Sequence, residues 1–299
     1  MTYKKQNHIP VLLKESIENL ITDKNGVYVD ATYGLGGHSF SILEKLGEKS
    51  ILIAIDQDKE SIKKNFIKDK RFYLFHNNFI YIKDILNFFS MKKVSGILVD
   101  LGLSSFQIEN LSRGFSMKEN CILDMRMNQE SNNYNAQNII NEYSEKQLCQ
   151  VLQTYGDFTN AKKIVKKILD KRENKKICTS YDLKNIFFIK GSLKKRNRFF
   201  SRLFQSIRIE VNNEIFMLKQ LLYISSELIS KGGRLVIISY HSVEDRIIKN
   251  FLKKGIFLKK NICYTPFKII NKKVIRPTID ELRNNYRSRS AKLRIAEKL

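Results

Sequence analysis

Acidic and aromatic residues end four short apolar runs in the first hundred residues. Asp30 follows "VYV", Asp56 follows "ILIAI", Asp100 follows "GILV", and Phe79 ends "RFYLFHNNF". In an open α/β sheet, ligands bind at the carboxyl ends of the strands. We therefore expect these four side chains to face one crevice.

The stretch "DATYGLGGHS", residues 30–39, predicts a nucleoside cofactor in that crevice. Its glycines let the backbone pass close to a ligand, and Asp56 stands 20 residues beyond Gly36 (56 − 36 = 20), a spacing that suits an acid binding ribose. A dinucleotide motif reads G-x-G-x-x-G, but counting from Gly34 its sixth position is Ser39, which disfavours NAD. S-adenosylmethionine carries an ammonium and a sulfonium, which favour an acid such as Asp30 beside the loop. The structural alternative is a tight turn that Asp30 only caps.

Hydrophobic periodicity predicts the elements that position these residues. Up to residue 104, short β-type runs alternate with helical runs, which predicts a parallel, doubly wound α/β sheet. Helical patterns then continue without strands until "KGGRLVIIS", so we expect a helical insertion. The predicted domains are residues 1–107 with 214–299, and the insertion at 108–213.

Composition points to a polyanionic partner. The chain has 54 Lys and Arg against 30 Asp and Glu, a net charge of +24, which suits nucleic acid. An AT-rich genome that favours Lys, Asn and Ile is the alternative explanation, and both stay open. No apolar stretch approaches the roughly 20 residues that span a bilayer, and no signal peptide is evident, so we expect a cytoplasmic protein without a membrane partner. The scattered cysteines predict no metal site.

Several longer motifs resemble one family across almost the whole chain. They include "GILVDLGLSSFQIE", "LDMRMN", "FQSIRIEVNNE" and "YHSVEDR", within which "DLGLSSFQ", "LDMRM" and "HSVEDR" are the most specific. They are similar to the bacterial small-subunit ribosomal RNA cytosine-N4 methyltransferases, the RsmH or MraW family. The resemblance implies a Rossmann-like methyltransferase domain with a helical insertion, and S-adenosylmethionine-dependent methylation of a cytidine in the decoding region of 16S rRNA.

The resemblance also implies a set of cofactor contacts. Asp56 would bind the ribose and Phe79 would flank the adenine, while His38 and Phe79 each have a plain packing role as the alternative. The implied contacts are Gly36, Gly37, His38, Asp56, Phe79, Asp100 and Gln107.

Asp100 and His241 are the candidate catalytic residues. Asp100 can accept a hydrogen bond from the cytosine amine and take up charge as the amine becomes cationic, and His241 is a candidate for base recognition or proton removal. A purely structural loop is the alternative for His241. Where many amine methyltransferases have an aromatic after the fourth strand, this chain has "DLGLSS", so stacking must come from elsewhere. Phe106, Phe115 and Tyr240 are the candidates.

Arginines in the insertion are the candidate RNA contacts. They are Arg113, Arg126, Arg196, Arg198, Arg202 and Arg208. Phe199, Phe200 and Phe204 interleave with the last four, which suits phosphate contact with base stacking, although a helix with these rings in the core is the alternative. The chain also departs from its relatives here, with "RFFSRLFQS" at 198–206 where "HPATRTFQA" is usual.

Two rival functions remain for the chain. One is a non-catalytic RNA-binding ribosome assembly factor that keeps a vestigial cofactor pocket, and the other is an NAD-dependent oxidoreductase. The preferred partner is 16S rRNA within the small ribosomal subunit, and a homodimer is a further expectation.

Overall fold

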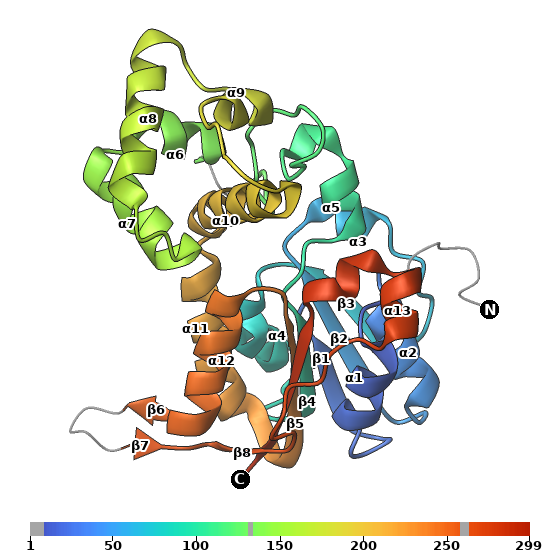
Figure 1. The fold of residues 1–299 in the computed structure, drawn as a ribbon. Coiled ribbons are helices and arrows are strands. Elements are labelled where there is room, and N and C mark those ends of the chain that lie inside the picture. The colour runs from blue at the N-terminus through green and yellow to red at the C-terminus, as the bar shows by residue number, and fades with distance from the viewer. Residues whose placement is uncertain (1–8, 131–133, 258–262) are drawn as a thin grey trace. The chain divides into compact units, whose positions relative to one another are not determined.

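The computed structural model describes residues 9–130, 134–257 and 263–299. The chain divides into two compact units, each continuous in space (Figure 1). The sheet unit comprises Met1–Gly102 and Met217–Leu299, and the helical unit comprises Leu103–Phe216. The boundaries lie a few residues from those that the change of periodicity predicts, 107/108 and 213/214. None of the described helices is long and apolar enough to cross a membrane.

The sheet unit is built on a seven-stranded sheet in the order β3-β2-β1-β4-β5-β9-β8. The strands β3, β2, β1, β4 and β5 are parallel to one another, which confirms the α/β fold. The strands are β1 Val27–Asp30, β2 Ile51–Asp56, β3 Phe72–His76, β4 Val94–Asp100, β5 Ile229–Ser239, β8 Phe267–Ile269 and β9 Lys292–Lys298. A separate antiparallel pair is formed by β6 Ile256–Phe257 and β7 Cys263–Tyr264.

The expectation of a wholly parallel sheet is wrong at one side. Strand β9 runs antiparallel to β5 and pairs on its other edge with β8, also antiparallel. Strand β8 has only three residues and β9 reads "KLRIAEK", with charges between its apolar residues, so neither forms the apolar run that marks the parallel strands. The arginine-rich segment at residues 283–294 thus leads into strand β9.

Alternating side chains of the strands bury both faces of the sheet. Val29, Ile53 and Val99 point to one face, which α4, α11 and α12 cover. Their neighbours Tyr28 and Leu52 point to the opposite face, which α1 and α2 cover. The helices of this unit are α1 Leu13–Leu20, α2 Gly37–Lys45, α3 Lys59–Lys63, α4 Ile82–Phe88, α12 Ser242–Lys254 and α13 Ile279–Asn284, with η1 Phe79–Tyr81 and η3 Tyr286–Ser290. Helix α11, Glu214–Leu228, begins in the helical unit and continues here.

The helical unit folds around a core of its own. Its buried residues come from the segment 115–125 and from helices α6 to α10, which the amphipathic patterns predict. The elements are α5 Ser105–Glu109, η2 Leu111–Arg113, α6 Ala136–Glu142, α7 Glu145–Gly156, α8 Ala161–Asn174, α9 Ser180–Asn185 and α10 Leu193–Asn212. The basic run at 194–198 is helical, because Ser192 caps α10 by accepting from the Lys195 amide.

Candidate functional site

Three carboxyl groups lie at one edge of the sheet unit. Asp30, Asp56 and Asp100 are the last residues of β1, β2 and β4, which are neighbours in the sheet. Phe79 begins η1 just after β3 and is partly buried. The Asp100 amide donates to Thr32 Oγ1 at 2.6 Å, which ties the ends of β4 and β1 together. These four residues therefore lie at the carboxyl ends of neighbouring strands, where the sequence predicted them.

The glycine loop between β1 and α2 makes a tight turn that needs glycine at specific positions. Gly34 and Gly36 have φ of +57° and +81°, a region that other residues enter only with strain. A Cβ on Gly36 would lie 2.5 Å from Tyr33 Oη, so the tyrosine ring packs directly on the loop backbone. A Cβ on Gly34 would meet nothing within 4 Å. The loop is thus packed on one side and open at Gly34.

Asp56 joins the end of β2 to the glycine loop. Its Oδ2 accepts from the Gly34 amide at 2.7 Å and its Oδ1 from the Asp58 amide at 2.8 Å. Burial raises the pKa of Asp56 to about 7, although these two amide donors oppose the rise. A carboxylate oxygen can accept more than one hydrogen bond, so Asp56 retains acceptor capacity for a ligand hydroxyl.

Asp30 and His38 are buried residues that contact the glycine loop and its neighbours. Asp30 is 1% exposed and accepts from Ser39 Oγ at 2.6 Å and from the Thr32 amide at 3.2 Å. His38 is buried in the first turn of α2, with Nε2 3.2 Å from the Val11 carbonyl oxygen. Burial raises the pKa of Asp30 and lowers that of His38. Both residues position the loop. These contacts match the structural alternatives, a turn capped by Asp30 and a packing role for His38.

Asp100 lies against Tyr240, the first residue after β5. Burial raises the pKa of Asp100 to about 6, while a hydrogen bond from the Tyr240 hydroxyl lowers it. The Tyr240 ring packs on Gly102, where a Cβ would lie 2.7 Å from ring carbon Cε2. The pKa of Tyr240 is raised well above its usual value, first by burial and then by Asp100, so the hydroxyl stays a donor. Tyr240 therefore positions Asp100, a role that sequence reasoning missed by considering this ring for stacking.

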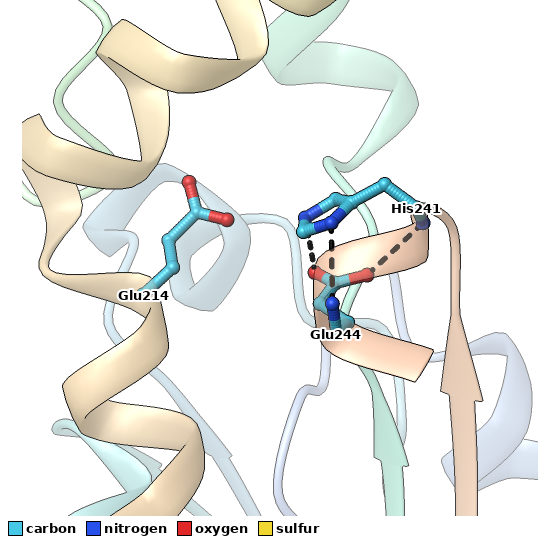
Figure 2. Close-up of side chains that lie close together, drawn as sticks. All are labelled: Glu214, His241 and Glu244. Atoms are coloured by element: carbon cyan, nitrogen blue, oxygen red, sulfur yellow. Dashed lines mark hydrogen bonds and ion pairs between the residues drawn. The ribbon is translucent and has the colours of Figure 1, made fainter. Parts of the chain in front are cut away.

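His241 is the N-cap residue of α12. Its Nδ1 accepts from the Glu244 amide at 3.3 Å, and its Nε2 lies 3.0 Å from Glu244 Oε1 (Figure 2). Glu244 Oε2 in turn accepts from the Tyr240 amide at 2.9 Å. This reciprocal capping matches the structural alternative for His241.

The remaining predicted cofactor contact, Gln107, and the remaining candidate stacking rings belong to the helical unit. Gln107 completes the capping box of α5, accepting from the Ser104 amide at 3.0 Å. Phe115 is 8% exposed within the core of this unit, so it offers no ring for stacking. Phe106 is half-buried. The predicted stacking by Phe200 and Phe204 is also wrong, because both are 5% exposed or less and face the core.

Several of the predicted RNA-binding arginines contact other residues of the same chain. Arg113 is 3% exposed and donates to the Arg126 and Met127 carbonyl oxygens at 3.0 and 2.8 Å. Arg126 forms a two-pronged pair with Asp124, which lowers the pKa of that carboxyl against the effect of burial. The burial and carbonyl contacts of Arg113 give it a structural role.

Arg202 and Arg208 are engaged in the same way. Arg208 is paired through two nitrogens with Glu214, each at 2.8 Å. Arg202 donates to the Gly156 carbonyl at 2.6 Å and to the Asp157 carbonyl, and its guanidinium stacks on the Phe158 ring. Sequence spacing did not show these contacts, because the partners lie on a different helix or turn.

Arg196 and Arg198 stand apart from the other candidates. Both are exposed on α10, and neither is paired with a carboxylate in the part of the chain that the structure describes. Arg294, by contrast, lies in β9 and pairs with Asp245 at 2.8 Å. The predicted RNA-binding set thus separates into structural arginines and two that face solvent.

Comparison with known proteins identifies the family. The model of the MraW methylase family matches residues 5–299. The chain is similar to the ribosomal RNA small subunit methyltransferase H of Karelsulcia muelleri, with 49% identity over 97% of this chain and 98% of the relative. It is 44% identical to the protein of the same name from Christiangramia forsetii, over 98% of each chain. The chain belongs to the MraW methylase family and is an S-adenosylmethionine-dependent methyltransferase.

Proposed function

We propose that this enzyme methylates N4 of a cytidine in the decoding region of 16S rRNA, within the small ribosomal subunit. Relatives that match it over nearly their full length are named as methyltransferases of small-subunit ribosomal RNA. The observation that carries the proposal is the row of carboxyl groups at adjacent strand ends, with Asp30 buried, Asp56 and Asp100 partly buried, and the pKa of Asp56 at about 7 and that of Asp100 at about 6. Perturbed carboxyls gathered at one edge of an α/β sheet are typical of an active site.

The edge fits S-adenosylmethionine, which supplies a methyl group on a positively charged sulfur. Asp56 has carboxylate lone pairs left for ribose hydroxyls, and Phe79 stands beside it at the end of the next strand. The backbone is open at Gly34, where no atom lies within 4 Å of a Cβ position. We assign Gly36, Gly37, Asp56 and Phe79 to cofactor contact, with His38 holding the first turn of α2.

Asp100 is the residue that we assign to the chemistry. A cytosine amine is a poor nucleophile because its lone pair is delocalised into the ring. A carboxylate that accepts a hydrogen bond from the amine increases the electron density on N4, and it can take the proton as the new bond forms. The Tyr240 hydroxyl and the Gly102 amide, 3.4 Å from Oδ1, hold Asp100 in place and favour its ionised form.

The helical unit supplies the RNA contacts in this proposal. Arg196 and Arg198 are exposed cations on α10, so they can contact phosphates without breaking an ion pair to a carboxylate of the described residues. Because ribosomal RNA is methylated where it is assembled, we place the enzyme in the cytoplasm. The homodimer expected from the sequence stays a prediction, and sedimentation of the purified chain tests it.

Transfer of labelled methyl to unmodified small subunits tests the function. The enzyme should label 16S rRNA, and mass mapping of nuclease fragments should place the label on one cytidine as an N4-methyl group. Binding of the subunit without transfer would instead support the assembly-factor alternative. Label on a ring carbon or on another base would overturn the assignment to an exocyclic amine.

A further inference from the structure

Phe188 carries an aromatic ring that the helical unit leaves in solvent. The ring is 81% exposed, whereas that of Phe187 is 9% exposed in the core. The segment here is neither helix nor strand, and its side chains alternate, with Ile189 packed against the core and Lys190 exposed. A single exposed ring is common, so its surroundings decide whether it has a role.

Two observations place the backbone of the Phe188 segment next to the N-terminal turns of α10. The Phe187 ring centroid lies 5.3 Å from that of Phe199. A Cβ on Gly191 would lie 3.2 Å from Lys195 Cδ. The backbone of segment 187–191 therefore runs next to the first turns of α10, and the exposed Phe188 side chain projects from this segment into solvent.

The chain segment that carries this ring has charges of one sign. No Asp or Glu occurs between residues 182 and 210. Lys190, Lys195, Arg196 and Arg198 are all exposed there, and none of the four is paired with a carboxylate among the residues that the structure describes. Cations near the start of a helix also oppose its dipole, so α10 itself does not account for Lys195 and Arg196. The surroundings favour a polyanion over a protein partner of mixed charge.

We propose that an unpaired RNA base stacks on Phe188 while Lys190, Lys195, Arg196 and Arg198 contact the neighbouring phosphates. These five residues are the Phe188 surface. Base stacking on an aromatic ring tolerates any sequence but requires a base that is not already stacked in a duplex. The inference rests on the proposed function for the identity of the RNA, and goes beyond it by naming the stacking ring and the single-stranded state of what it binds.

The absence of tryptophan from the chain permits a direct test. Phe188→Trp introduces a single indole, whose emission is quenched when a base stacks on it. Phe88→Trp is the matched control, because Phe88 is 80% exposed in the sheet unit. Each full-length variant is titrated with a short single-stranded RNA and with the same sequence as a duplex. We expect single-stranded RNA to quench the indole at 188 strongly, the duplex to quench it weakly, and neither to affect the indole at 88.

Affinity provides the second readout. Phe188→Ala should weaken binding of the single-stranded RNA by about 5- to 150-fold, the range for loss of one stacked base. Phe188→Tyr should restore the affinity, and Phe88→Ala should leave it unchanged. A far-UV circular dichroism spectrum and a denaturant midpoint equal to those of the wild type show that Phe188→Ala is folded, including the helical unit.

Three results would overturn the proposal. The first is unchanged emission at 188 when the RNA is saturating, and the second is unchanged RNA affinity in folded Phe188→Ala. The third is emission that changes with protein concentration alone, which would assign the ring to a second protein chain. Quenching at 188 in an enzyme that methylates no ribosomal RNA would refute the proposed function and leave the surface standing, so the two failures are distinguishable.

Discussion

The carboxyl edge of the sheet unit and the Phe188 surface of the helical unit use charge in opposite ways. At the edge, Asp56 and Asp100 are carboxyl groups in poorly solvated positions, which raise their pKa to about 7 and about 6. On the surface, Arg196 and Arg198 are cations in water. A buried charge depends on a few fixed hydrogen bonds, whereas an exposed one acts mainly by its sign. Single substitutions should therefore have large effects at the edge and small, additive ones on the surface.

The largest effect is expected from Asp100→Ala. We expect the single-turnover rate of methyl transfer at saturating cofactor to fall by about 100-fold, because a positioned general base contributes roughly 10²- to 10⁴-fold. Tyr240→Phe is the matched variant, since it keeps Asp100 but removes the hydroxyl that lowers its pKa. Without that hydroxyl the pKa of Asp100 rises further. As the pH is lowered, the rate of Tyr240→Phe should therefore begin to fall at a higher pH than the rate of the wild type. A wild-type rate for Asp100→Ala would remove Asp100 from the chemistry.

A smaller effect is expected from removing Arg196 and Arg198 together. If each contacts one phosphate of single-stranded RNA, the slope of log affinity against log salt should flatten by roughly 0.7 per contact, or about 1.4 in all. Lys249→Ala with Lys253→Ala is the charge-matched control, since both lysines are exposed on α12. An equal loss in the control would show that net charge alone attracts RNA, as the alternative of genome composition holds.

Asp56 should make stability depend on pH in an unusual direction. Its pKa rises from 3.8 to about 7 on folding, so the folded state binds more protons than the unfolded state between these values. This carboxyl therefore favours folding at low pH, and the contribution is lost as the pH rises through about 7. Denaturant unfolding of Asp56→Asn should show it gaining stability relative to the wild type between pH 5 and pH 8. A constant difference across that range would contradict the raised pKa.

The smallest effect separates Arg202 from its exposed neighbours. Arg202→Ala removes donors to two carbonyl oxygens and the stacking on Phe158. We expect the free energy of unfolding to fall by about 1 kcal/mol, with the salt dependence of RNA binding unchanged. Denaturant titration and a salt series measure both quantities. A flatter salt slope at unchanged stability would return Arg202 to the RNA-contact set.

The edge was predictable from the sequence because a strand end is a local pattern. Apolar runs that end in Asp30, Asp56 and Asp100 place those residues without knowledge of the strand order. The same rule, applied to the run "RLVIIS", places Tyr240 and His241 near the same strand ends. What it does not give is hydrogen bonding, so the capping of α12 by His241 was visible only as one of two alternatives.

The RNA surface was less predictable because burial is decided by packing. "RFFSRLF" alternates charge and aromatic residues, and the sequence does not show that Phe200 and Phe204 face the core while Phe188, from the preceding segment, faces solvent. Arg113 and Arg202 read as free cations for the same reason, since the carbonyl oxygens that they contact carry no residue-type signal. Antiparallel β9 was missed because charged residues interrupt its apolar ones in "KLRIAEK", so the sequence shows no apolar run there.

A calorimetric titration with S-adenosylmethionine tests the division between the two regions most directly. Asp56→Ala should bind the cofactor about 1–3 kcal/mol more weakly than the wild type, because it loses a charged acceptor for ribose hydroxyls. The Arg196→Ala, Arg198→Ala variant should bind it with unchanged affinity. Wild-type affinity in folded Asp56→Ala would contradict the assignment of the cofactor to the carboxyl edge of the sheet.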